Sequence, residues 1–201
     1  MTVQSVSEIT TAGKTIEFPD HNLAEFAFWG RSNVGKSTLI NKLLASGTVA
    51  KASKNAGKTR RVHFFEVKTP EFIFSVVDMP GYGYARVSKD KRLVWEGLIS
   101  DYLIDRNQLI HLFLLVDASI PPQKIDQETI EKLQLSKVPF SVVFTKTDKA
   151  KQAEVDKTIS LICKLNPSVQ RFQTSTLKKT GFSEIQEFME KTLAKLDVEK
   201  M

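Results

Sequence analysis

The chain has 201 residues, of which 41% are hydrophobic and 26% charged, and its formal net charge is +6. One α/β domain of this size can bury a sizeable core, and the composition is ordinary for a globular protein in water. No apolar stretch approaches the length of a membrane span, the first residues lack an apolar signal core, and Cys163 is the only cysteine, so we expect a cytoplasmic protein without disulfides or a membrane partner.

The first elements follow a short N-terminal arm, residues 1–23. Residues 24–30 predict a buried strand, and residues 36–46 predict a helix with its apolar side chains on one side. Residues 47–60 are small, polar and basic without an apolar period, which predicts a mobile loop.

Two apolar runs with a short connection, residues 62–67 and 72–78, predict an antiparallel hairpin. Residues 89–105 predict an amphipathic helix that begins after Ser88 as its N-cap. The nearly continuous apolar run over residues 109–117 predicts a central parallel strand covered on both faces.

Helices and strands then alternate to the end of the chain. They are expected as a helix at 121–135, a strand at 138–146, a helix at 151–165, a strand at 169–175 and a helix at 181–196. This order predicts one doubly wound α/β domain over residues 24–198, with a mostly parallel sheet, one antiparallel edge hairpin and helices on both faces. Ligands of such sheets bind beyond the carboxyl ends of the strands.

A glycine-rich loop follows the first buried strand and precedes a helix. Gly30, Gly35, Lys36 and Ser37 satisfy the spacing G-x-x-x-x-G-K-[ST], which predicts a loop whose N–H groups hold phosphates. Lys36 would neutralise the β- and γ-phosphates, and the Ser37 hydroxyl would ligate Mg²⁺. The predicted phosphate-binding residues are Gly30, Arg31, Ser32, Asn33, Val34, Gly35, Lys36, Ser37 and Thr38.

Two further segments could sense the γ-phosphate. In "DMPG" Asp78 would hold Mg²⁺ through water and the Gly81 N–H would touch the γ-phosphate, with Met79 and Pro80 between them. In "GKT", residues 57–59, Gly57 and Lys58 precede Thr59, whose hydroxyl would reach Mg²⁺ when a γ-phosphate draws its loop inward.

The segment "TKTDK" after a buried strand points to guanine. The Asp148 carboxylate can accept hydrogen bonds from N1–H and the 2-amino group of guanine, which adenine does not offer. The Lys146 stem can lie along the flat base. The predicted base-binding residues are Thr145, Lys146 and Asp148, together with Thr174, Ser175 and Thr176, whose backbone N–H groups could meet the guanine O6.

In order along the chain, "GRSNVGKSTLINKLL", "AGKTR", "DMPGYGYARVSK" and "TKTDK" resemble the EngB/YihA/YsxC group of bacterial ribosome-assembly GTPases, and "PGYGYARVSK" is specific to that group. The resemblance covers nearly the whole chain from about Glu25. It implies a Ras-like fold, binding of GTP and GDP, Mg²⁺ dependence, a role in large ribosomal subunit assembly, and an involvement in cell division and septation. Lys36, Thr59 and Gly81 would then carry catalysis.

Two positions differ from the broader GTPase pattern. Thr145 stands where many GTPases have asparagine, and its hydroxyl can still bond to loop backbone. Tyr82 stands where Ras-like enzymes place the glutamine that orients the attacking water, so we expect slow intrinsic hydrolysis. Related GTPases with asparagine at the position of Asn33 can hold K⁺, which suggests stimulation by that ion.

Basic residues flank the two γ-phosphate-sensing segments. They are Lys51, Lys54, Lys58, Arg60 and Arg61 on one side, and Arg86, Lys89, Lys91 and Arg92 on the other. These charges favour docking on the large ribosomal subunit or its RNA when GTP is bound. We expect the protein to be a monomer.

Two other functions stay open from the residues. A small-molecule P-loop kinase would use the same phosphate loop but would leave "TKTDK" unexplained, and a division regulator could bind a septal protein. We interpret Trp29, His63, His111 and Asp117 as structural.

Overall fold

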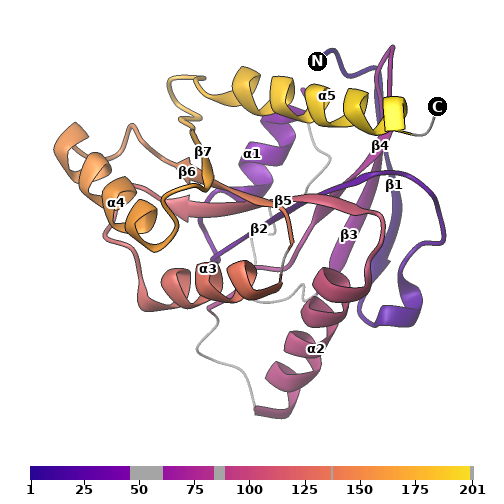
Figure 1. Ribbon diagram of the computed structural model, residues 1–201, viewed down its shortest axis with the longest axis horizontal. Helices are drawn as coiled ribbons and strands as arrows, with labels where there is room; N and C mark the ends of the chain where they lie inside the picture. Colours follow the sequence, from indigo (N-terminus) through magenta and orange to yellow (C-terminus); the bar gives the residue numbers. More distant parts are fainter. Residues whose placement is uncertain (46–60, 84–88, 137, 200–201) are drawn as a thin grey trace.

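The computed structural model describes residues 1–45, 61–83, 89–136 and 138–199, so the expected loop 47–60 and Ser88 lie outside the described residues. The described chain forms a seven-stranded sheet with helices on both faces (Figure 1). The strands are β1 (Ser5–Ala12), β2 (Glu25–Gly30), β3 (Val62–Lys68), β4 (Ile73–Asp78), β5 (Leu109–Asp117), β6 (Phe140–Thr145) and β7 (Gln170–Gln173). The helices are the 3-10 turn η1 (Thr15–Glu17), α1 (Lys36–Leu43), α2 (Lys89–Asp105), α3 (Lys124–Ser136), α4 (Gln152–Leu165) and α5 (Phe182–Glu199).

The strand order is β1-β3-β4-β2-β5-β6-β7. The pairs from β4 through β2, β5 and β6 to β7 are parallel, whereas β3 pairs antiparallel with both β4 and β1. The predicted α/β class, its mostly parallel sheet and the antiparallel hairpin are therefore confirmed.

The sequence predicted that the β3–β4 hairpin lies at the edge of the sheet. This prediction is wrong, because β1 lies outside β3. Strand β1, inside the N-terminal arm, pairs with the outer side of β3, from Ser5 opposite Lys68 to Ala12 opposite Val62. Most residues of β1 are polar and at least partly exposed, so the segment carries little apolar signal of its own. Its position depends on the free edge of β3, because an unpaired strand edge offers hydrogen-bonding groups to another strand.

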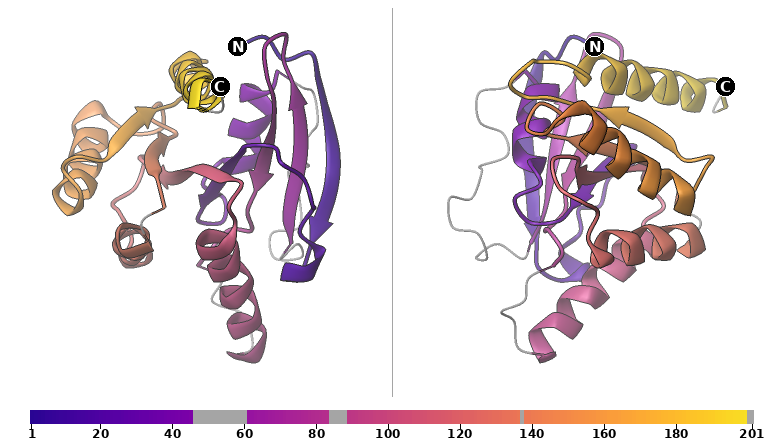
Figure 2. Two further views of the ribbon diagram at one scale, coloured as in Figure 1. Left: turned by 45° about the vertical axis from the view of Figure 1, so that its right-hand side comes forward. Right: turned by 90° about the vertical axis from the view of Figure 1, so that its left-hand side faces the viewer.

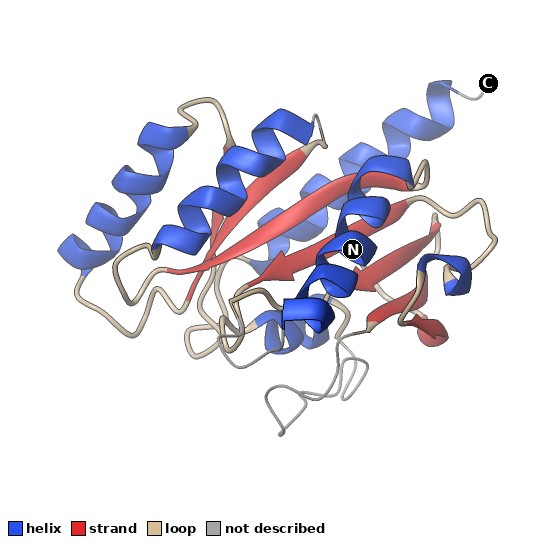
Figure 3. Cartoon of the chain, turned by 90° about the horizontal axis from the view of Figure 1, so that it is seen from below, coloured by secondary structure: helices blue, strands red, loops and turns tan. Residues whose placement is uncertain are grey.

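Strand β2 supplies side chains to cores on both faces of the sheet. Phe26 and Phe28 pack with α1 and α5, whereas Ala27 and Trp29 belong to the core under α2, α3 and α4. This alternation follows from the two-residue period of a strand. The turned views show α1 and α5 on one face and the other helices on the opposite face (Figures 2 and 3).

A buried polar cluster fixes the amino end of β2. The fully buried Glu25 carboxylate accepts hydrogen bonds from Tyr102 Oη at 2.8 Å and from Arg106 Nη2 at 2.6 Å. Arg106 Nη2 also donates to the Pro19 carbonyl at 2.8 Å, which ties the N-terminal arm to the domain. The buried charge of Glu25 is thus paired and hydrogen bonded.

Among the described residues, none of the helices combines the length and the apolar character that a bilayer crossing needs.

Candidate functional site

The carboxyl end of β2 leads into the predicted phosphate loop. β2 ends at Gly30 and α1 begins at Lys36, with left-handed backbone at Asn33 (φ 64°) and Gly35 (φ 103°) between them. The first i→i−4 hydrogen bond of α1 runs from Leu39 N to Gly35 O at 2.9 Å. The N–H groups of the residues before Leu39 therefore have no acceptor within the helix. Such a helix start, where the dipole end is also positive, suits an anion.

Lys36 and Asp78 meet where β2 and β4 end side by side. The Lys36 Nζ forms an ion pair with Asp78 Oδ1, and their side chains are only 13% and 12% exposed. The pairing follows from the parallel register of β2 and β4, which places Phe28 beside Asp78. A cation that could neutralise phosphates and a carboxylate that could hold a metal through water therefore lie together, with Ser37 next in the chain.

The segment after β4 is held tightly against the phosphate loop. Tyr82 N donates to Gly30 O at 3.2 Å, and Ser32 N donates to Tyr82 O at 3.3 Å. A Cβ atom at Gly81 would lie 3.1 Å from both the N and the Oγ of Ser32, so glycine permits this close approach. Met79 is fully buried, and the Pro80 carbonyl accepts a hydrogen bond from Trp29 Nε1 at 3.1 Å.

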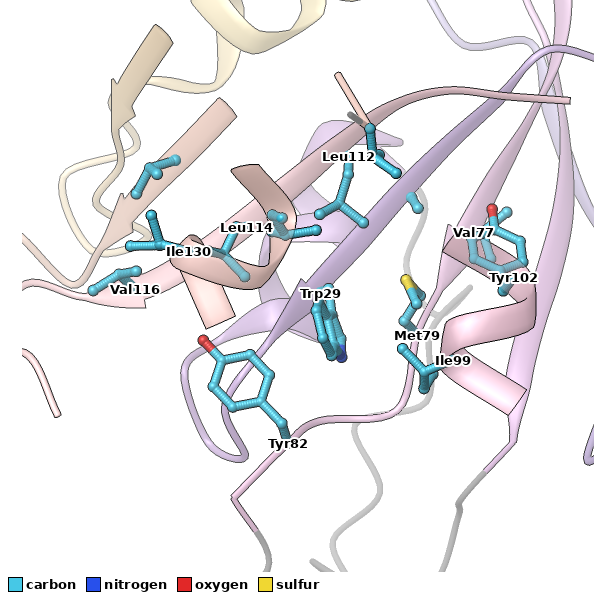
Figure 4. Packing of buried hydrophobic residues seen from close by; sticks show 14 of the residues in the cluster. Trp29, Val77, Met79, Tyr82, Ile99, Tyr102, Leu112, Leu114, Val116 and Ile130 are labelled. Atoms are coloured by element: carbon cyan, nitrogen blue, oxygen red, sulfur yellow. The ribbon is translucent and has the colours of Figure 1, made fainter. Parts of the chain in front are cut away.

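The phenol of Tyr82 is buried below this loop. Its ring packs edge-on against Trp29 at 5.1 Å (Figure 4). Its Oη donates a hydrogen bond to Asp126 Oδ1 at 3.0 Å. Desolvation, followed by the charge of Asp126, raises the pKa of Tyr82 well above its ordinary value. The phenol therefore stays protonated, and its hydroxyl group donates its hydrogen bond to Asp126 within the core.

The residues of "TKTDK" are bonded to the backbone of the phosphate loop. Thr145 Oγ1 donates to Val34 O at 2.7 Å, and Lys146 Nζ donates to Asn33 O at 2.7 Å. The expectation that Thr145 bonds to loop backbone is thus confirmed. Lys146 has left-handed backbone (φ 57°), a conformation that in residues other than glycine is concentrated at functional sites. These bonds hold the segments predicted to bind the base and the phosphates at one edge of the sheet.

A second loop supports Asp148. Ser175 Oγ donates to Asp148 Oδ1, and Thr147 Oγ1 donates to Thr174 O at 3.2 Å. The N–H groups of Thr174 and Ser175 donate to Phe144 O at 2.7 Å and Thr180 O at 3.2 Å. Of the three N–H groups expected to face the guanine O6, these two already have protein acceptors, which makes Thr176 the strongest candidate.

Asp117, which the sequence reasoning assigned to a structural role, contacts a residue of the predicted base-binding segment. Its Oδ2 lies 2.6 Å from Lys146 Nζ, and its Oδ1 accepts hydrogen bonds from Ser119 Oγ at 2.6 Å and Ser119 N at 3.0 Å. Desolvation raises the pKa of Asp117, but the bonds from Lys146 and Ser119 outweigh it and lower that pKa below its ordinary value. Asp117 is therefore a carboxylate that fixes the Lys146 ammonium.

The order of the strands could have revealed Asp117, because it ends a predicted strand next to the strand of "TKTDK".

The other predicted residues differ in whether the structure describes them. Gly57, Lys58 and Thr59 lie outside the described residues. His63 and His111, in contrast, lie within the strands β3 and β5.

A phosphate loop bonded to a base-recognition loop at the carboxyl edge of this sheet defines a P-loop nucleotide-binding domain. The family model described as "50S ribosome-binding GTPase" matches residues 25–146. A "Probable GTP-binding protein EngB" of Caldanaerobacter subterraneus subsp. tengcongensis is 37% identical over 197 residues, covering 97% of this chain and 100% of the relative. Another EngB protein, of Thermotoga petrophila, is 44% identical over 154 residues, with 77% of each chain covered.

Solved structures agree on the fold. The structure of a probable GTP-binding protein engB has a TM-score of 0.66 at 22% identity and covers 86% of this chain and 100% of that one. Aquifex aeolicus Era bound to GDP and AlF4⁻ has a TM-score of 0.69 at 25% identity, with 86% and 57% covered. The chain belongs to the EngB family of 50S ribosome-binding GTPases. It is a GTPase of Ras-like fold that binds GTP and GDP, and the small-molecule kinase alternative is excluded.

Proposed function

We propose that this GTPase is a cytoplasmic, monomeric switch in the assembly of the large ribosomal subunit, and that normal cell division and septation depend on this role. The observation that carries the proposal is the pair of hydrogen bonds from Thr145 to Val34 O and from Lys146 to Asn33 O. They join the segment that would hold the phosphates to the segment that would hold the base. One nucleotide could therefore contact both segments at once.

On the phosphate side, we assign the triphosphate to the residues of the loop 30–38. Lys36 pairs with Asp78 in this structure, and it would turn from that carboxylate to the β- and γ-phosphates. The Gly81 N–H would contact the γ-phosphate. Magnesium fits the donor set, because a hydroxyl and a carboxylate lie at the phosphate loop and hard cations prefer oxygen ligands. Ser37, Asp78 and, from the other sensing segment, Thr59 would hold it, and bound Mg²⁺ would neutralise developing phosphate charge.

On the base side, Asp148 would accept both guanine donors while Ser175 holds its carboxylate. The Lys146 stem would cover the base, since its ammonium is held at Asp117 and at Asn33 O. A Cβ built on Gly35 would lie 4.0 Å from Lys146 Cε, which shows how closely that stem passes the phosphate loop. The N–H of Thr176 would meet the guanine O6.

Slow intrinsic hydrolysis follows from Tyr82. Its phenol is 3% exposed and bonded to Asp126, so it cannot orient an attacking water as a glutamine would. Asn33, whose side chain is exposed, is the proposed K⁺ ligand, and the ion would supply positive charge near the phosphates.

The ribosomal partner is supported by the description of the matching family model and by a solved relative. Era, with a TM-score of 0.69 to this chain, has been solved with MgGDPNP and a fragment of 16S ribosomal RNA. That RNA belongs to the small subunit, so the likeness supports a ribosomal RNA partner in general, and the large subunit rests on the description of the family model. The net charge of +6 favours a polyanionic partner as well. The GTP-bound state would fix the basic residues around Thr59 and Gly81 into one surface, whereas ordering them without a γ-phosphate costs conformational entropy.

Sedimentation with large ribosomal subunits tests this function. We expect more protein to co-sediment with a non-hydrolysable GTP analogue than with GDP, and binding to weaken steeply as salt rises. Charge reversal at Arg60, Arg61, Arg86 and Lys89 should abolish co-sedimentation without changing GTP affinity. Reversal of four exposed lysines on α4 and α5, at Lys157, Lys164, Lys191 and Lys195, is the matched control and should leave it intact. Equal co-sedimentation in every condition would contradict the ribosomal function and favour a septal protein partner.

A further inference from the structure

Asp126, at the start of α3, lies beneath the phosphate loop although no nucleotide motif includes it. Its side chain is 1% exposed. Its Oδ1 accepts the hydrogen bond from Tyr82 Oη and lies 3.7 Å from Arg31 Nε, while its Oδ2 accepts from Gln123 N at 3.1 Å. Asp126 thus connects the first turn of α3 to both segments that meet at Gly81.

Arg31 and Tyr82, which both face Asp126, are also paired with each other. Arg31 of the phosphate loop and Tyr82 form an isolated parallel β-bridge. Gly83 (φ 87°) follows closely, since a Cβ there would lie 3.3 Å from Arg31 Cγ and 3.9 Å from Ile125 Cδ1 of α3. The chain on the carboxyl side of Gly81 is therefore held from both sides by contacts that converge on one carboxylate.

We propose that Asp126 is a positioning residue of the GTP site, which through Tyr82 and Arg31 holds the Gly81 amide against the phosphate loop and so favours triphosphate over diphosphate. The inference rests on the proposed contact between Gly81 and the γ-phosphate. A pre-positioned amide does not have to be ordered when the γ-phosphate arrives, and preorganisation of this kind strengthens binding. GDP lacks the γ-phosphate, so the affinity for GDP should not depend on the contacts of Asp126 with Tyr82 and Arg31.

The chain contains a matched control for this argument. At the opposite end of β2, Tyr102 Oη donates to the buried Glu25 carboxylate, which Arg106 also binds. Desolvation, followed by the charge of Glu25, raises the pKa of Tyr102, as the equivalent causes do for Tyr82. Tyr102→Phe therefore removes the same chemical group from the same kind of cluster, but away from the nucleotide.

The decisive measurement is the ratio of the Kd values for a non-hydrolysable GTP analogue and for GDP, determined by calorimetry. In Tyr82→Phe, which loses the hydrogen bond to Asp126, and in Asp126→Asn, which loses the negative charge facing Arg31, we expect the affinity for the GTP analogue to fall roughly three- to tenfold while GDP affinity is unchanged. In Tyr102→Phe we expect a lower unfolding temperature and an unchanged ratio.

A ratio that stays at the wild-type value in Tyr82→Phe and in Asp126→Asn, or that shifts as much in Tyr102→Phe, would overturn the proposal. The double variant Tyr82→Phe with Asp126→Asn should shift the ratio no more than the larger single effect, because both act through one anchor. Failure of the wild-type protein to bind either nucleotide would instead contradict the nucleotide site itself, so the two failures can be distinguished.

Discussion

The ammonium group of Lys146 lies 2.6 Å from the carboxylate of Asp117. The register of the parallel strands β5 and β6 places Asp117 opposite Thr145, so the ends of these strands bring the two charges together. Strand pairing, rather than a local motif, thus fixes the lysine that we assign to the base.

Asp117→Asn should weaken GTP and GDP binding equally, by about 1.5 kcal/mol or roughly tenfold, because the Lys146 stem loses its charged anchor. Calorimetry with both nucleotides checks this. Glu187→Gln is the control, since Glu187 also lies 2.6 Å from a lysine ammonium but on the exposed face of α5. Loss of affinity for the triphosphate alone would contradict a role on the base side.

Asp148→Asn should shift base preference from guanine toward xanthine. An amide donor suits the xanthine 2-oxo group and opposes the guanine 2-amino group, so GTP binding should weaken by on the order of 1–3 kcal/mol while XTP binding improves. Ser175→Ala, which removes the hydroxyl bonded to Asp148, should weaken GTP without a change of preference. If titrations show the Asp148→Asn protein binding GTP and XTP equally well, the guanine assignment is wrong.

Asn33 predicts faster hydrolysis in KCl than in NaCl at equal ionic strength. The cation would supply positive charge beside the phosphates, and it would matter more here because the buried Tyr82 cannot orient the attacking water. Phosphate release measured in both salts tests this, and Asn33→Ala should remove the difference. Stimulation by K⁺ that survives in Asn33→Ala would place the ion elsewhere.

We expect the folded protein to lose stability in mild acid because of the buried His111. Its ring is 7% exposed and shares a hydrogen bond of 2.8 Å with Ser141 Oγ, and desolvation lowers the pKa of His111 from 6.5 to about 4. Between about pH 6.5 and pH 4 the unfolded chain binds a proton that the native protein does not. The stability present above pH 6.5 is therefore lost as pH falls, by up to about 3 kcal/mol.

Urea unfolding between pH 7.5 and 4.5 measures this effect. His111→Gln should flatten the dependence of unfolding free energy on pH by up to about 1.4 kcal/mol per pH unit near pH 5.5. His63→Gln is the control, because His63 is 28% exposed. An identical slope in the wild type and His111→Gln would show that His111 does not carry the effect.

Arg106→Leu should destabilise the fold by about 3–5 kcal/mol, since it leaves Glu25 as a buried carboxylate without its cation. Thermal or urea unfolding measures the change. Arg61→Leu breaks a partly exposed pair with Glu17 at 3.4 Å and should change stability by less than about 1 kcal/mol. Guanine nucleotide affinity of the folded Arg106→Leu protein should equal that of the wild type, because the cluster lies at the amino end of β2.

Local patterns in the sequence were enough for the fold class and for the main residues of the phosphate loop. Apolar runs predicted the strands β2, β4, β5 and β6 to within one or two residues, because each of these strands is buried along most of its length. The short strand β7 was predicted equally well, although only Phe172 in it is buried. The loop from Gly30 to Ser37 was also readable, since its phosphate-binding geometry depends on neighbours in the chain and on glycine at Gly35.

Contacts between segments that are distant in the sequence determined the placement of β1 and the partners of Asp117 and Tyr82, which no local pattern predicts. β1 is a polar segment placed by the free edge of β3, and Asp117 acquires its role only when β5 lies beside β6. Tyr82 follows a glycine in a motif, but its direction was set by Asp126 of α3, 44 residues further along. Sequence by itself determined which backbone could hold a polyphosphate, because that is a local property. Tertiary structure decided which side chains fix this backbone, because a buried charge or hydroxyl takes its partner from whichever strand or helix packs against it.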